Sequence, residues 1–156
     1  MKKLVFRGIA VVGLVMATGA QAESWTMDVS FTPANWIGGV GPDNEWGRAG
    51  TSEITVNGQL EGQAFESRGT CAFMDQPPNA LFDFHMTCQD QATDGNASHV
   101  LFGCNAIQGR EREYSCVGGI QGTAGQIQGR QGSVTMHLHS ISESGASGTG
   151  VGQWFE

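Results

Sequence analysis

The chain has 156 residues, 24 of them glycine, and its 15 acidic side chains outnumber 8 basic ones for a net charge of −7. An acidic surface repels phosphate backbones and anionic lipid headgroups, so we expect no nucleic-acid partner and no binding to a membrane surface. The length is that of one domain with a single hydrophobic core.

Residues 1–22 have the pattern of a cleaved secretory signal peptide. Basic residues near the start precede a short apolar stretch, and the A-Q-A at residues 20–22 is a cleavage site of the A-x-A type. The apolar stretch is shorter than the ~20 residues that cross a bilayer as a helix. Cleavage removes three of the eight basic residues and no acidic one, which leaves residues 23–156 with a net charge of −10. We therefore expect a single domain over residues 23–156, periplasmic or secreted, and no membrane segment after cleavage.

An alternating segment, SWTMDVSF, follows the expected cleavage site, and after it Thr32–Gly50 does not alternate. A structureless loop of this length is uncommon unless it is functional. Its tryptophans either plug one end of the core or, together with its charged groups, form the mouth of a binding site. The aromatic and charged residues of this loop are Trp36, Asp43, Glu45, Trp46 and Arg48.

After residue 50 the hydrophobic pattern has a period of two, and no segment shows a helical stripe. Turn signals separate the alternating segments at Asn57-Gly58, Gln76–Asn79, Asp94–Asn96 and Gln108–Arg112. Short strands with glycine-rich turns are typical of an antiparallel barrel or sandwich, and tight turns favour an up-and-down order. The eight expected strands are SWTMDVSF, SEITVNG, QAFESRGTCAF, LFDFHMTC, HVLFGCNAI, EYSCVGG, SVTMHLHSI and GTGVGQWFE.

Four cysteines in an exported chain predict disulfide bonds. In an antiparallel hairpin, directly opposed residues are equidistant from the centre of the turn. Cys71 and Cys88 centre on the turn near residue 79, and Cys104 and Cys116 centre on residue 110. Opposed Cα atoms lie roughly 4.5–5.5 Å apart, within disulfide range, so both pairs can form.

The middle two cysteines, Cys88 and Cys104, also centre on a turn, at residue 96. We therefore expect all four cysteines in one row across adjacent strands, on the face that carries Phe82 and Phe102. Next-nearest strands are about 9.6 Å apart, which excludes a bond between them, and a bond within the middle pair leaves the outer two unpaired. The prediction is Cys71–Cys88 with Cys104–Cys116. A straight row of thiolates does not close around a tetrahedral metal ion.

His137-x-His139 has the spacing of a metal-binding pair on one face of a strand. The strand register places both imidazoles outside the barrel, together with Asp83, His85 and His99. A catalytic metal normally needs three protein ligands, and no hairpin brings a third histidine opposite this pair. We expect solvated surface histidines, no metal site and no cofactor.

No pattern in the chain assigns a catalytic residue. The segment Asp90–Asn96 loosely resembles a calcium loop, but it lacks the spacing and the closing glutamate of an EF-hand, so we interpret it as a polar hairpin turn. Residues 110–113, which alternate in charge beside a turn, are interpreted as a solvated tip. The chain contains no G-x-S-x-G and no serine that its neighbours mark as a nucleophile.

The segment GGIQGTAGQIQGRQGSVTMHLHS runs from Gly118 to Ser140. A phosphate loop would open into a helix, but these glycines open into an alternating strand, and too little chain follows for a linker to a second domain. The glycines are therefore expected to shape turns and close approaches in a coiled sheet.

GTAGQIQGRQGSVT and the later GTGVGQW resemble a glycine pattern of small secreted bacterial proteins in the allene oxide cyclase and dirigent-like barrel group. The matching positions are Gly122, Thr123, Gly125, Gly129, Gly132 and Ser133. This chain departs from the pattern by the inserted Ala124, by Ile127 in place of an aromatic residue and by Arg130 in place of an aliphatic one. The resemblance covers the last third of the chain and implies an eight-stranded antiparallel barrel, with no catalytic motif to transfer.

The expected fold is therefore all-β, an eight-stranded antiparallel up-and-down barrel with two hairpin disulfides. A barrel of this size is filled by side chains or holds one small ligand, and we expect a small apolar ligand. A cyclase or isomerase that uses the charged residues of the Thr32–Gly50 loop, and a structural or partner-binding protein with a filled core, are the alternatives. The expected ligand-binding residues are Phe65, Phe82, Phe84, Met86, Phe102 and Met136 inside the barrel, with Trp36 or Trp46 at its mouth.

Overall fold

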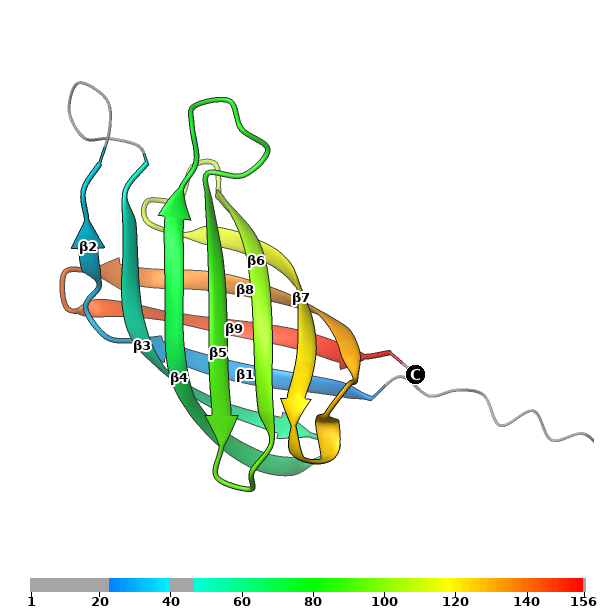
Figure 1. Cartoon of the computed structure of the whole chain (residues 1–156). Helices are drawn as coiled ribbons and strands as arrows, with labels where there is room; N and C mark the ends of the chain where they lie inside the picture. The colour runs from blue at the N-terminus through cyan, green and yellow to red at the C-terminus, as the bar shows by residue number, and fades with distance from the viewer. Residues whose placement is uncertain (1–22, 40–46, 156) are drawn as a thin grey trace, which may run out of the picture.

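The structure is a computed structural model, and it describes residues 23–39 and 47–155. The expected signal peptide, Asp43, Glu45 and Trp46 lie outside the described residues. Nine strands and one short 3-10 helix form the described part (Figure 1). The strands are β1 (Ser24–Phe31), β2 (Asn35–Ile37), β3 (Ala49–Leu60), β4 (Gln63–Asp75), β5 (Phe84–Ala92), β6 (Ala97–Ala106), β7 (Tyr114–Ala124), β8 (Gln131–Ser142) and β9 (Gly145–Trp154), and the 3-10 helix is Gly125–Ile127.

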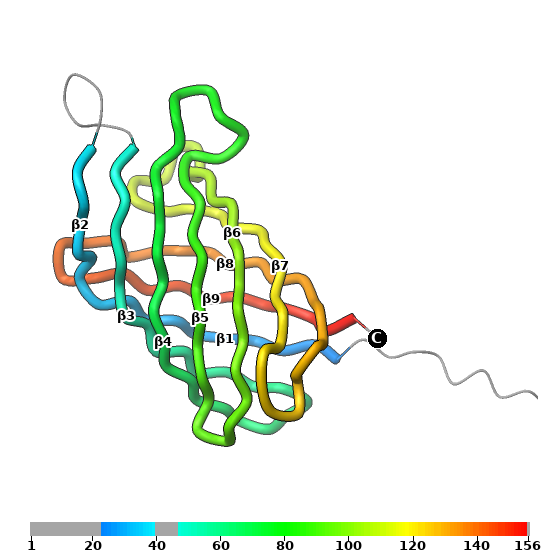
Figure 2. The backbone as a smooth tube through the Cα atoms, in the orientation of Figure 1, coloured from blue at the N-terminus to red at the C-terminus, as the bar shows by residue number. Residues whose placement is uncertain are grey.

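Eight of the strands close into an antiparallel barrel. Neighbours along the sheet are β1, β9, β8, β7, β6, β5, β4 and β3, and β1 then pairs with β3 to close the ring. The tube in Figure 2 follows this up-and-down course, in which β3 to β9 are joined by successive hairpins. The expected fold class is confirmed. Within the described residues, no helix is long and apolar enough to cross a membrane.

The ninth strand, β2, lies inside Thr32–Gly50, the segment expected to be a loop. It pairs with residues 49–51 of β3, whereas the later residues of β3, from Ile54 to Leu60, pair with β1. β3 is therefore longer than the barrel wall, and its first residues hold β2 at one end of the barrel (Figure 1). Expecting no strand in this segment was wrong, because a three-residue strand is too short to show a period of two.

Three of the expected turns are present, and one is misplaced. Asn57 and Gly58 lie within β3, and the β3–β4 turn is formed by Glu61 and Gly62, whose φ angles are +51° and +80°. Positive φ at both central residues is the geometry of the tight hairpin turn that matches strand twist. The inward alternation of Ile54 and Val56 continues past Asn57, so the chain gains further burial by turning later.

The glycine-rich segment Gly118–Ser140 covers the end of β7, the 3-10 helix and most of β8. Its glycines shape the turn between the two strands, as expected. Gly125 begins the 3-10 helix with φ of +72°, and Gly129 has φ of +82° shortly before β8. These left-handed values favour glycine because a Cβ atom is strained there. The turn is fastened to its neighbour by Asn96 Oδ1, which accepts a hydrogen bond from the Gln126 amide at 2.7 Å.

Both predicted disulfides are present. Cys71–Cys88 joins β4 to β5 and Cys104–Cys116 joins β6 to β7, with Cα separations of 4.0 and 4.1 Å. The expected single row of four cysteines is wrong, because Cys88 faces Val100 and Cys104 faces Phe84. The β5–β6 hairpin is centred on residue 94 instead of residue 96, and a shift of two in the centre moves every pair by four residues.

Removing either disulfide lowers the stability of the fold. Each bond closes a short loop, with sequence separations of 17 and 12 residues, so we expect each double variant, C71A/C88A and C104A/C116A, to lose about 2–4 kcal/mol of unfolding free energy. Urea denaturation followed by circular dichroism measures the loss. Peptide mapping under non-reducing conditions is the control, and a fragment that links Cys88 to Cys104 would contradict the pairing.

Candidate functional site

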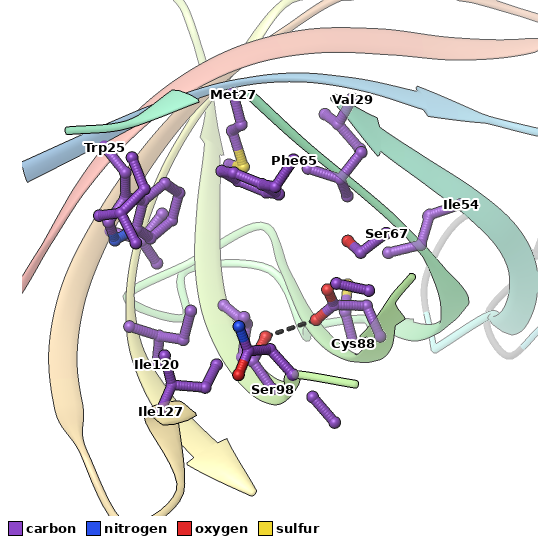
Figure 3. Close-up of a pocket in the computed structure, with 18 of the residues that line it drawn as sticks. Trp25, Met27, Val29, Ile54, Phe65, Ser67, Cys88, Ser98, Ile120 and Ile127 are labelled. Atoms are coloured by element: carbon purple, nitrogen blue, oxygen red, sulfur yellow. Dashed lines mark hydrogen bonds between the residues drawn. The ribbon is translucent and has the colours of Figure 1, made fainter. Parts of the chain in front are cut away.

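A cavity of about 180 Å³ lies inside the barrel, toward the end formed by the β3–β4, β5–β6 and β7–β8 turns (Figure 3). Strand alternation supplies its walls, because every second side chain of each strand points inward. Ile127 of the 3-10 helix also lines the cavity. The apolar residues that line it include Trp25, Met27, Val29, Ile54, Val56, Phe65, Met86, Val100, Phe102, Ile120, Val134, Met136 and Trp154.

Glycines on the inner wall make room for the aromatic lining. A Cβ atom on Gly152 would lie 2.2 Å from the Trp25 ring, and one on Gly58 would lie 2.3 Å from the Phe65 ring. Such distances are well inside van der Waals contact, so both rings lie directly against the backbone of the facing strand. The GTGVGQW segment, which contains Gly152, thus has a packing role in this barrel.

Two buried polar atoms of the cavity wall have no hydrogen-bond partner among the described residues. They are Nε1 of Trp25, whose residue is 7 % exposed, and Oγ of Ser67, whose residue is 2 % exposed. Both residues line the cavity, and Figure 3 shows them on different walls, with the Ser67 hydroxyl directed toward the interior. Buried polar atoms are nearly always paired in native proteins, so two in one cavity point to a ligand or to water.

A carboxylate also faces the interior. Asp90 follows Met86 and Cys88 along the inward face of β5, and its Oδ1 accepts a hydrogen bond from the hydroxyl of Ser98 on β6, drawn as a dashed line in Figure 3. The interpretation of Asp90 as part of a turn was wrong, because β5 continues to Ala92. The alternation Met86-x-Cys88-x-Asp90 carries the signal that could have placed this residue inside.

The structure divides the predicted ligand-binding residues between several places. Phe65, Met86, Phe102 and Met136 line the cavity inside the barrel. Phe82 is not inward: its ring covers Gly103 on the outer face of β6 and meets His85 edge to face, with 5.4 Å between ring centroids. It lies before β5 begins, so the alternation of that strand does not set its direction. Sequence reasoning missed Trp25, Ser67, Asp90 and Ser98 as lining residues.

Phe84 and Trp36 line a second, more open cavity of about 440 Å³ at the opposite end of the barrel. Trp36 is 53 % exposed, the Arg48 guanidinium lies 4.7 Å from its ring centroid, and Phe73 meets it edge to face. Arg48 also forms a 2.8 Å ion pair with Asp75. Trp36 therefore lies at a mouth of the barrel, and the charge of Arg48 is already paired.

The strand histidines lie outside the barrel, as the register predicts. His137 Nε2 lies 2.7 Å from a carboxylate oxygen of Glu113, and His99 Nε2 lies 2.7 Å from the Thr87 hydroxyl. The hydrogen bond from His137 lowers the pKa of Glu113, and the nearby Arg110 acts in the same direction. Glu113 is therefore a paired carboxylate and not simply part of a solvated tip. In the part of the chain that is described, no three potential ligands are grouped around a metal position.

No protein-family model matches the chain, and no curated protein matches it either. The fold by itself does not imply an activity, because small barrels carry many unrelated functions.

Adding a methyl group at Gly152 tests the packing of the cavity wall. Gly152→Ala forces the Trp25 ring away from β9, so we expect a loss of about 1–3 kcal/mol in unfolding free energy and a red shift of tryptophan emission. Gly119→Ala is the matched control, since its Cβ would meet only the Gly132 carbonyl oxygen, at 3.9 Å. Equal stability of the two variants would show that Trp25 does not depend on close approach to this glycine.

Removing the imidazole of His137 tests its hydrogen bond with Glu113 on the outer face of the barrel. His137→Ala deletes the hydrogen bond that lowers the pKa of Glu113, so that pKa rises toward its ordinary value. A carboxyl group with a lowered pKa in the folded state stabilises the fold above the unfolded-state pKa, and this contribution is lost as the pH falls through the lowered value. Carboxyl NMR titration measures the change. In the control His99→Ala the pKa of Glu113 stays unchanged, and an unchanged value in His137→Ala would contradict the assignment.

Proposed function

We propose that this protein is an exported binding protein whose barrel cavity holds a small, mainly apolar molecule with one hydrogen-bond acceptor. The cavity supports this function because its lining is apolar apart from a few polar groups, the usual composition of a small-molecule site. The two disulfides support export, since such bonds persist in oxidising compartments and are rare in the cytosol. We also propose kinship with the allene oxide cyclase and dirigent-like group, which the eight-stranded barrel supports.

The observation that carries the proposal is the unpaired indole Nε1–H of Trp25. This group can only donate, and leaving a buried donor unpaired costs about 1–3 kcal/mol. A carbonyl or ether oxygen on a bound ligand removes that cost and fixes the orientation of the ligand. Ser67 offers a second polar contact that can donate or accept.

The size of the cavity limits the ligand. A cavity of roughly 150 Å³ lined by aliphatic and aromatic side chains binds benzene, so a volume of about 180 Å³ suits one six-membered ring with a short substituent. A longer molecule would have to extend through the end of the barrel. An interior with this volume favours binding over a structural protein with a filled core.

A pair of probes that differ by one acceptor tests the proposal. Acetophenone carries a carbonyl oxygen and ethylbenzene does not, so isothermal titration calorimetry should show about three- to tenfold tighter binding of acetophenone. Trp25→Phe keeps an aromatic ring and deletes the donor, and we expect it to abolish that preference with little change for ethylbenzene.

Trp154→Phe is the matched control, because it truncates another buried indole that lines the cavity and whose Nε1 is not an unpaired buried atom. This variant should keep the preference for acetophenone. If neither probe binds the unmodified protein, the proposed function is wrong.

A further inference from the structure

The charged residues that line the cavity are all acidic. Its lining includes the carboxylates of Asp90 and Asp94 and no lysine or arginine among the described residues. Asp94 is exposed and uses its oxygens to accept hydrogen bonds from the backbone and side chain of Asn96. Asp90 is therefore the carboxylate available to a molecule inside the barrel.

Asp90 has no counter-ion in the described part of the protein. The ion pairs there are Arg48–Asp75, Arg68–Glu66, Arg110–Glu113, Arg130–Glu23 and His137–Glu113, and Asp90 takes part in none of them. Its Oδ1 accepts the Ser98 hydroxyl, and no donor among the described residues is paired with Oδ2. A carboxylate beside an apolar cavity gains from a cation more than one in water does, because the surroundings screen the charge less.

A neighbour of Asp90 offers a further acceptor for that cation. Gly69 lies directly opposite Asp90 on β4, and Ser67 lies two residues along the same strand. The unpaired hydroxyl oxygen of Ser67 can accept a hydrogen bond as well as donate one. Aromatic rings of Trp25, Phe65 and Phe102 form other parts of the wall, and a cation within about 6 Å of such a ring is also attracted to it.

We infer that the natural ligand is a protonated amine on an apolar body of about one ring. The ammonium group lies at Asp90 Oδ2 with Ser67 as a further acceptor, and the apolar body fills the space between Met86, Phe102 and Met136. Trp25 Nε1 donates to an acceptor on the far side of the ligand, since Figure 3 shows Trp25 on a different wall from Ser98. This inference rests on the proposed function and specifies its ligand class.

Three probes of similar size test the inference: benzylamine, its isostere benzyl alcohol, and benzoate. In calorimetric titrations at neutral pH and low salt, benzylamine should bind at least about tenfold tighter than benzyl alcohol, as expected of one charge-assisted hydrogen bond. Benzoate should show no detectable binding. Higher ionic strength should weaken the binding of benzylamine and leave that of benzyl alcohol unchanged, a measurement that needs no variant.

Asp90→Asn should reduce the affinity for benzylamine to that for benzyl alcohol, while the affinity for benzyl alcohol stays the same. The asparagine carbonyl can still accept the Ser98 hydroxyl, and circular dichroism checks that the variant folds. Asp28→Asn is the matched control, because it removes the same charge from an exposed position on β1 and should leave benzylamine binding within about twofold of the original.

The outcomes separate the two proposals. Equal binding of benzylamine and benzyl alcohol, or an amine preference that survives in Asp90→Asn, would overturn the amine inference and leave the binding function in place. Failure of both neutral and cationic probes to bind would overturn the proposed function as well.

Discussion

The pairing of β1 with β3 is the constraint on which the rest of the structure depends. Seven residue pairs, from Trp25 opposite Leu60 to Phe31 opposite Ile54, join β1 to β3, whose other edge is bound to β4 along its whole length. This pairing gives the sheet an interior, and only then does strand alternation separate buried from exposed side chains. It also brings Trp25 on β1 to one wall of the same cavity as Ser67 on β4 and Asp90 on β5.

Inside the barrel, packing favours apolar side chains at the inward positions of the strands, whereas ligand binding needs some polar ones. Isoleucine, valine, methionine and phenylalanine fill most inward positions and stabilise the fold by burial. Ser67 and Asp90 take inward positions without the full set of hydrogen bonds that burial normally requires. Such positions weaken the fold on its own, and in natural proteins departures of this kind are concentrated at functional sites. A ligand that pairs with these groups recovers part of the lost stability.

The disulfides and the turns show which features of the hairpins can be predicted from the sequence and which cannot. The Cys71–Cys88 and Cys104–Cys116 pairs were predictable, because each centres on a turn marked by proline, glycine or charge. The register of β5 against β6, which sets the position of one disulfide relative to the other, was not predictable. The β5–β6 turn offers Asp94, Gly95 and Asn96, and a two-residue difference in the centre of the turn displaces the cysteines by four positions. Asn57-Gly58 failed as a turn for a related reason, because a local turn signal lost to the burial gained by a longer strand.

Sequence by itself determined the all-β class, the number of barrel strands and the face of most side chains, because a period of two is a local property of the chain. It could also have placed Asp90 inside, from the alternation that begins at Met86. Only the tertiary structure decided that Ser67, Trp25 and Asp90 line one cavity, that Phe82 lies outside, and that β2 continues the sheet beyond the barrel. These features depend on strand stagger and on which side chains meet across the interior, and no local pattern encodes distances between residues that are far apart in the chain.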